Sequence, residues 1–249
     1  MTTFFRILIC IILAIPASAI VNYLADVLPQ SRRLTQPTCK TCDHPRAVRE
    51  FLLMRRCANC NCNPPMRHSL VLISSILLFI VIGLLPLEDL GLAAGLIVLV
   101  YFMVVFVIDM EHRLILTETS IFGLILGILV GWHLHGILPT AAGGISGFLV
   151  MFGFYGLGIV FSKWMSKQRG EEIDEVALGF GDVTLSTILG LMVGFQQVFL
   201  LLLLTILLGG IFSLLLLIIM RILNRYQQFT AIPYAPFLLS AAAYLLFRP

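Results

Sequence analysis

The chain has 249 residues, of which 59% are hydrophobic and only 12% are charged. Soluble domains are about 45–50% apolar and about 25% charged, so this composition excludes an ordinary soluble domain and a disordered chain. A net charge of +3 does not favour a nucleic-acid-binding protein. The sequence therefore predicts a polytopic protein that is embedded in the lipid bilayer.

Eight apolar stretches, separated by charged or proline-containing segments, predict eight membrane spans. They cover residues 4–28, 69–87, 90–108, 119–138, 140–161, 183–195, 198–220 and 232–247, the sixth being short for a complete crossing. These stretches lack the alternation of a transmembrane β-barrel, so the expected fold is an all-α helix bundle. The expected parts are a first transmembrane helix (1–28), a cysteine-rich segment (29–68) and a seven-span helix bundle (69–249).

The distribution of positive charge predicts the orientation. Fourteen of the 16 basic residues fall in loops that share one side of an eight-span chain, namely Arg32, Arg33, Lys40, Arg46, Arg49, Arg55, Arg56, Arg67, Arg113, Lys163, Lys167, Arg169, Arg221 and Arg225. The positive-inside rule then places both termini outside and the cysteine-rich segment in the cytoplasm. Ala17-Ser18-Ala19 resembles a signal-peptide cleavage site, but cleavage would carry the positive segment outward, so a retained first helix is favoured.

Glycines recur every fourth residue on two of the predicted spans. Gly123, Gly127 and Gly131 lie on the fourth span, and Gly190 and Gly194 lie on the sixth. Small residues at this spacing let membrane helices approach closely. We expect these glycines to serve helix packing, and Cys10 in the first span as well.

Four cysteines in the segment 29–68 have the spacing of a zinc site. Cys39 and Cys42 form one Cys-x-x-Cys pair, Cys57 and Cys60 form another, and 14 residues separate the pairs. Four thiolates on one Zn²⁺ would join two tight turns in a segment with few apolar residues. The alternative is a pair of disulfides, which a reducing cytoplasm disfavours. Cys62, His44 and His68 are further possible ligands, although both histidines are expected to be loop residues.

Two aspartates are the candidate catalytic residues. Asp109 ends the third predicted span and Asp182 begins the sixth, so the topology puts both at the cytoplasmic face at similar depth. Two such carboxylates can share a proton, with one activating water and the other protonating a peptide carbonyl. Gly179 and Gly181 would let a substrate backbone approach. The alternative is that either Asp only caps its helix or pairs with Arg113.

The remaining acidic residues near the spans are expected to be solvated. These are Asp26, Glu111, Glu118 and the acidic run between Glu171 and Glu175, all at span ends or in loops. A charge in such a place contacts water by default.

An ordered set of motifs resembles the type IV prepilin peptidase family. The motifs are Ile20-Val21-Asn22 with Leu28-Pro29, the two Cys-x-x-Cys pairs, Ile108-Asp109 through Ile115, Gly179-Phe180-Gly181-Asp182-Val183, and Ile232-Pro233 through Phe237. The resemblance implies a membrane aspartic peptidase with Asp109 and Asp182 as catalytic residues. It implies prepilins or pseudopilins as substrates, cleaved at the cytoplasmic face of the inner membrane. It also implies N-methylation with S-adenosylmethionine in bifunctional members.

The chain departs from this family in a few places. Leu116-Thr117 stands where many members carry Pro-Asp, Thr184 where a Lys is usual, and Leu72 where a Glu is usual. Neither Asp is changed, so the departures bear on methyl transfer more than on peptide cleavage. Two other functions stay open: a non-enzymatic assembly protein that uses the cysteine segment for docking, and a proton-coupled transporter that uses the carboxylates as a relay.

Overall fold

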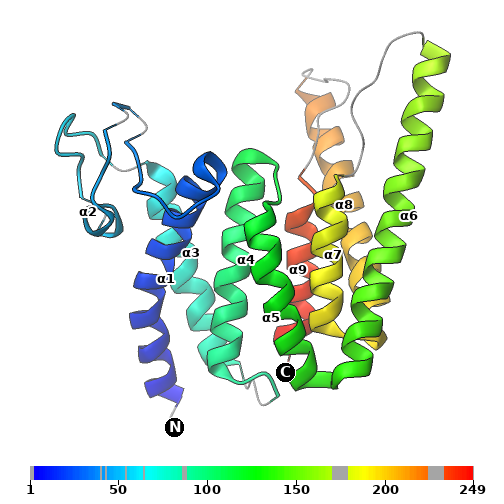
Figure 1. The fold of residues 1–249 in the computed structure, drawn as a ribbon, viewed down its shortest axis with the longest axis horizontal. Coiled ribbons are helices and arrows are strands. Elements are labelled where there is room, and N and C mark those ends of the chain that lie inside the picture. Colours follow the sequence, from blue (N-terminus) through cyan, green and yellow to red (C-terminus); the bar gives the residue numbers. More distant parts are fainter. Residues whose placement is uncertain are drawn as a thin grey trace. The chain divides into compact units, whose positions relative to one another are not determined.

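A computed structural model describes residues 3–39, 41–42, 44–53, 55–63, 65–85, 89–169, 179–223 and 233–248 of the chain. Over these residues the regular structure is entirely helical (Figure 1). The helices are α1 (Thr3–Ser31), α2 (Val48–Leu52), α3 (Met66–Leu84), α4 (Leu92–His112), α5 (Thr117–His135), α6 (Ile137–Arg169), α7 (Phe180–Val193), α8 (Phe195–Ile222) and α9 (Ala235–Phe247). The all-α fold is confirmed.

Each predicted apolar stretch coincides with a helix. Six of the described helices, α1, α3, α4, α5, α6 and α8, are long and apolar enough to cross a membrane, judged by length and composition. The helices α7 and α9 are apolar but have only 14 and 13 residues. The sixth predicted span, residues 183–195, was expected to be short, and the corresponding helix α7 is short. This is a multi-pass membrane protein, because so many long apolar helices cannot be covered by one soluble core.

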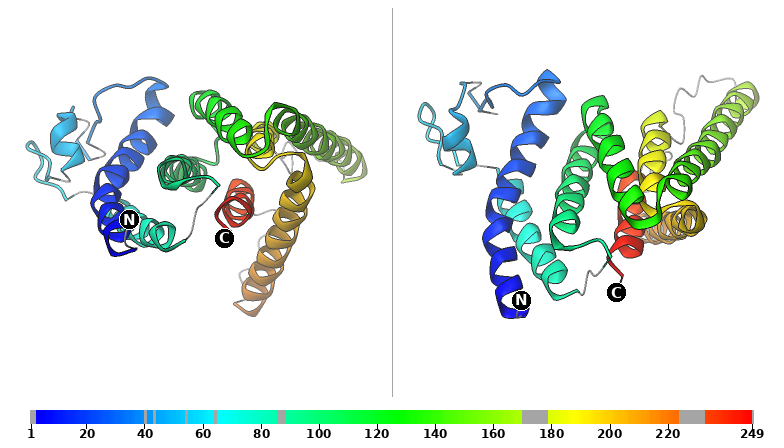
Figure 2. Two further views of the ribbon diagram at one scale, coloured as in Figure 1. Left: turned by 90° about the horizontal axis from the view of Figure 1, so that it is seen from below. Right: turned by 60° about the horizontal axis from the view of Figure 1, so that its bottom comes forward.

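The chain divides into two compact units, each described by itself. The first unit comprises Met1–His112 with the C-terminal residues Phe247–Pro249, and the second comprises Arg113–Leu246. In the first, α1 packs along α3 and against α4, and both views of Figure 2 show α1 and α3 side by side. In the second, α7 packs between α5, α6 and α8.

Small residues allow the helices of each unit to pack closely. In the first unit, Cys10 is fully buried, and a Cβ added to Gly83 would lie 3.2 Å from its sulfur. In the second, a Cβ on Gly127 would lie 3.0 Å from the carbonyl oxygen of Ile188, and one on Gly131 would collide with the carbonyl oxygen of Leu191. The packing roles expected for Cys10 and for these glycines are confirmed.

Candidate active site and metal centre

Asp109 lies in the last turn of α4, within the first unit. Its residue surface is 5% exposed, and Val105 and Ile108 beside it are buried as well. The helix forms because residues 92–108 are almost entirely apolar and contain no proline. A buried carboxyl group at the end of an apolar helix is costly, which makes Asp109 a functional candidate.

Asp182 lies in the first turn of α7, within the second unit. Gly179 is the N-cap residue, and its backbone N–H donates to Oδ2 of Asp182 at 3.1 Å. The backbone N–H groups at a helix N-terminus stabilise negative charge, so this position suits a carboxylate. This hydrogen bond shows that Asp182 caps its helix, which was one of the alternatives to a catalytic role. Capping occupies one carboxylate oxygen and is compatible with chemistry at the other.

The two glycines before Asp182 differ in their surroundings. A Cβ on Gly181 would lie 2.9 Å from the Cβ of Ile115, so this glycine admits an apolar neighbour. Among the residues that the structure describes, a Cβ on Gly179 would meet nothing closer than Oδ2 of Asp182, at 3.6 Å. With respect to these residues, the backbone at Gly179 is open on the side where a side chain would stand.

The four predicted cysteine ligands come together. Their sulfur atoms all lie within 4.8 Å of one another, with Cys39 and Cys60 3.6 Å apart and Cys42 and Cys57 3.8 Å apart. A disulfide requires about 2.05 Å. A tetrahedral zinc with Zn–S bonds of about 2.3 Å puts its sulfurs about 3.8 Å apart. The cluster can hold a metal ion, and its spacing fits zinc.

The protein also favours the thiolate form of two cysteines in this cluster, whereas the pKa of Cys60 is raised. Backbone N–H groups of Thr41 and Cys42 donate to the sulfur of Cys39 and lower the pKa of that thiol to about 6. Backbone N–H groups of Cys60 and Asn59 lower the pKa of Cys57 in the same way. Thiolates are the form that binds metal. Of the other possible ligands, His44 is an exposed loop residue whose ring contacts the carbonyl of Pro45.

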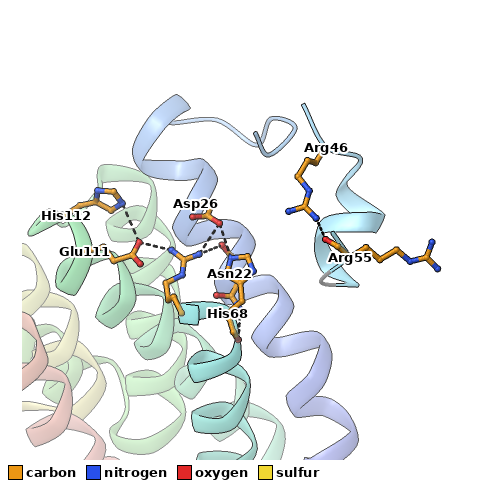
Figure 3. Close-up of polar contacts among 8 residues, drawn as sticks. Asn22, Asp26, Arg46, Arg55, His68, Glu111 and His112 are labelled. Carbon is orange, nitrogen blue, oxygen red and sulfur yellow. Dashed lines mark hydrogen bonds and ion pairs between the residues drawn. The ribbon is translucent and has the colours of Figure 1, made fainter. Parts of the chain in front are cut away.

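The aromatic side chain of Phe51 connects the cysteine segment to the long helices of its unit. Phe51 of α2 is 4% exposed, and its ring packs edge-on against His68, with centroids 5.1 Å apart, and against Tyr23, with centroids 6.4 Å apart. The guanidinium of Arg46 covers Phe51 at 5.5 Å from the ring centroid. The guanidinium of Arg46 also donates to the carbonyl of Arg55 (Figure 3). The side chain of Arg46 therefore links the two ends of the loop that contains α2.

The sequence-based interpretation of two polar residues is wrong. His68 is not a loop residue, because it lies in α3 and is 1% exposed. Asp26 is not solvated, because its side chain is 10% exposed and forms an ion pair with Arg67. Glu111 is exposed, as expected, and also pairs with Arg67. Asp26 lies within the first apolar stretch, where an acidic residue is a functional candidate by default, so the signal for it was present.

The expectation that the other acidic residues are solvated is contradicted at one place and lies outside the described residues at another. Glu118 was expected to be solvated, but Oε2 of this residue is buried in the second unit. The acidic run between Glu171 and Glu175 lies outside the described residues.

Known proteins were compared with the chain. Residues 96–214, just under half of the chain, match a profile of the type IV leader peptidase family. This range includes both Asp109 and Asp182. A prepilin leader peptidase/N-methyltransferase of Aeromonas salmonicida is 28% identical over 211 residues, which cover 80% of this chain and 67% of the relative.

Two further relatives have the same name. The one from Aeromonas hydrophila is 25% identical over 225 residues, covering 86% of this chain and 71% of the relative. The one from Pectobacterium carotovorum is 28% identical over 169 residues, covering 65% of this chain and 57% of the relative. No solved structure matches the chain. The matched range contains the two candidate aspartates, whereas the cysteine cluster precedes it.

Proposed function

We propose that this protein is a membrane aspartic endopeptidase that removes the leader peptides of type IV prepilins or pseudopilins. The observation that carries the proposal is the family match over residues 96–214, which includes two aspartates at helix ends. We propose that cleavage takes place at the cytoplasmic face of the inner membrane, with both termini of the chain outside. The positive charges of the loops support this orientation.

In the proposed mechanism, Asp109 and Asp182 act as one unit that shares a proton. The α7 N-terminus and the N–H of Gly179 support the ionised form of Asp182, which takes a proton from the attacking water. Asp109, in its buried position, supplies a proton to the carbonyl oxygen of the scissile peptide. We further propose that the substrate backbone passes beside Gly179 and Gly181.

The metal in this proposal is a structural zinc ion held by Cys39, Cys42, Cys57 and Cys60. Four thiolates complete the tetrahedral shell of zinc and leave no position for water or substrate. The metal would hold the two Cys-x-x-Cys turns together and would take no part in peptide cleavage.

A second activity is favoured by the names of the relatives, which include N-methyltransferase. We propose that methylation of the new N-terminal amine, with S-adenosylmethionine as methyl donor, is the activity to look for after cleavage. Mass spectrometry of the mature pilin-like partner would report the cleavage position and any added methyl group together.

The test of the peptidase proposal replaces each aspartate separately by Asn and follows shortening of a co-expressed prepilin. Asp109→Asn and Asp182→Asn should each abolish cleavage at normal membrane level, because an amide keeps the shape but cannot exchange the proton. The double variant should be no worse than either single variant, since members of a catalytic pair are strongly non-additive. Cleavage by either Asn variant would overturn the assignment. An assembly protein or a transporter would not shorten the prepilin at all.

A further inference from the structure

Arg67 forms ion pairs with two carboxylates that belong to two other helices. Its Nη2 lies 3.0 Å from Oδ2 of Asp26, on α1, and its Nη1 lies 2.6 Å from Oε2 of Glu111, on α4. Arg67 itself is in the first turn of α3. In Figure 3 the side chains of Asp26 and Glu111 point toward the same place at the start of α3. One planar guanidinium thus connects three helix ends of the first unit.

The Arg67–Asp26 pair is largely shielded from water, which distinguishes it from an ordinary surface ion pair, whereas the Arg67–Glu111 pair is exposed. The side chains of Arg67 and Asp26 are 14% and 10% exposed, and that of Glu111 is 31% exposed. Exposed pairs are weak because solvent screens them and the side chains lose entropy. A charge pair removed from water depends strongly on both partners, since the loss of one leaves the other uncompensated.

Neighbouring polar groups hold the charged side chains in place. Nε2 of His68 lies 3.2 Å from Oδ2 of Asp26, and Nη2 of Arg67 lies 3.4 Å from the carbonyl oxygen of Asn22. The ring of His68 is fixed in turn by the edge-on contact with Phe51. The position of the guanidinium is therefore determined by the packing of α1 and α3, and α4 is attached to it through Glu111.

The attachment point is next to the candidate catalytic residue. Glu111 follows Asp109 by two residues, in the last turn of α4, and the helix ends at His112. Residues two apart on a helix do not face each other, so the side chain of Asp109 points away from the side occupied by Arg67. The route from Arg67 to Asp109 that the printed contacts show runs through Glu111 and the backbone of this last turn. Without an anchor, the final turn of a helix frays.

We propose that Arg67 is a positioning residue for Asp109: by holding Glu111 against Asp26, it fixes the last turn of α4 and with it the catalytic carboxyl. This inference rests on the proposed peptidase function. It assigns to Asp26, Arg67 and Glu111 a role in the geometry of catalysis and not in binding the prepilin. Displacement of a catalytic group by about 1 Å can cost about a hundredfold in rate.

The test measures kcat and KM of the full-length protein in proteoliposomes with a purified prepilin, for variants corrected to equal folded amount. Arg67→Met should lower kcat by about ten- to a hundredfold and change KM by less than about twofold. Arg67→Lys should recover part of the lost kcat, because an ammonium keeps the charge but cannot hold two carboxylates in one planar fork. Arg49→Met, at an exposed arginine of α2, is the matched control and should leave both constants unchanged.

A double variant tests whether Arg67 works through Glu111. Glu111→Gln should lower kcat in the same direction but less, and Arg67→Met with Glu111→Gln should be no worse than Arg67→Met alone. Wild-type kcat in Arg67→Met, or independent losses in the double variant, would overturn the proposal. If Arg67→Met does not fold, Glu111→Gln decides alone, since it leaves the Arg67–Asp26 pair in place: a lowered kcat supports the role and an unchanged kcat overturns it.

The same series separates this proposal from the peptidase assignment. An active Asp109→Asn variant would overturn the assignment of Asp109 as catalytic, whatever Arg67 does. An inactive Asp109→Asn variant together with a fully active Arg67→Met variant would overturn only the positioning role.

Discussion

Gly143 of α6 and Gly190 of α7 are in mutual backbone contact. A Cβ on Gly190 would lie 2.5 Å from the carbonyl oxygen of Gly143, and a Cβ on Gly143 would collide with the carbonyl oxygen of Gly190. Asp182 lies on the same helix as Gly190, eight residues earlier, which is about 12 Å along the axis. The close approach of the two helices therefore fixes the helix that carries one of the candidate catalytic residues.

We expect Gly190→Ala to destabilise the protein by about 1–3 kcal/mol, because the added methyl group forces the backbones of α6 and α7 apart. Gly153→Ala on α6 is the matched control. A Cβ at Gly153 meets nothing within 4 Å, so this change should be neutral or stabilising by up to about 1 kcal/mol. Thermal unfolding in detergent would measure both. Equal changes in Tm for the two variants would contradict the contact.

The purified protein should contain about one zinc ion per chain. Replacing Cys39, Cys42, Cys57 or Cys60 by Ser should remove the ion and loosen the cysteine segment, because too few apolar residues lie there to form a core. Cys62→Ser is the control and should retain the metal, since Cys62 is outside the four-sulfur cluster found among the described residues. Metal analysis of protein prepared without chelators would decide, and a metal-free wild-type protein would rule out the site.

Gly181 should show separate effects on stability and on cleavage. Gly181→Ala places a methyl group 2.9 Å from the Cβ of Ile115, so the melting temperature should fall. Adding Ile115→Ala makes room and should restore the melting temperature to that of Ile115→Ala alone. Cleavage should stay about tenfold lower in the double variant if the substrate backbone passes beside this glycine. Recovery of both properties would limit Gly181 to helix packing.

Reporter fusions should place residues 29–68 in the cytoplasm. Fusions after Arg33 and after Arg55 should be active with a cytoplasmic reporter and inactive with a periplasmic one, because most of the basic residues share this side. A fusion at the C-terminus should give the opposite result. Periplasmic activity of the Arg55 fusion would reverse the orientation and with it the proposed side of cleavage.

Features with a local sequence pattern were predictable here. Long apolar runs predicted the helices because each run satisfies its own backbone hydrogen bonds, and two Cys-x-x-Cys pairs predicted the sulfur cluster because each turn is local. The short helix α2 was not predicted. Its five residues carry no periodic pattern, and Phe51 owes its burial to residues that are distant in the sequence.

Pairings between helices were not predictable in the same way. Asp26, Arg67 and Glu111 are far apart in the sequence, and although the place of Asp26 in an apolar stretch is a signal, no single position indicates which residue it pairs with. The close contact between Gly181 and Ile115 was not predictable either, because it depends on the tertiary packing that brings Ile115 next to the start of α7. Such contacts result from tertiary packing, and tertiary packing cannot be deduced from individual positions of one sequence.

The contact between Phe51 and His68 extends the influence of the metal beyond its own segment. The helix α2 is too short to keep its form alone, and ligands flank it at Cys42 and Cys57. Loss of the metal would free Phe51 from the ring of His68 and admit water to the imidazole that faces Asp26. With the structural zinc proposed above, a cell starved of zinc would then carry a protein whose membrane helices are loosened at their ends.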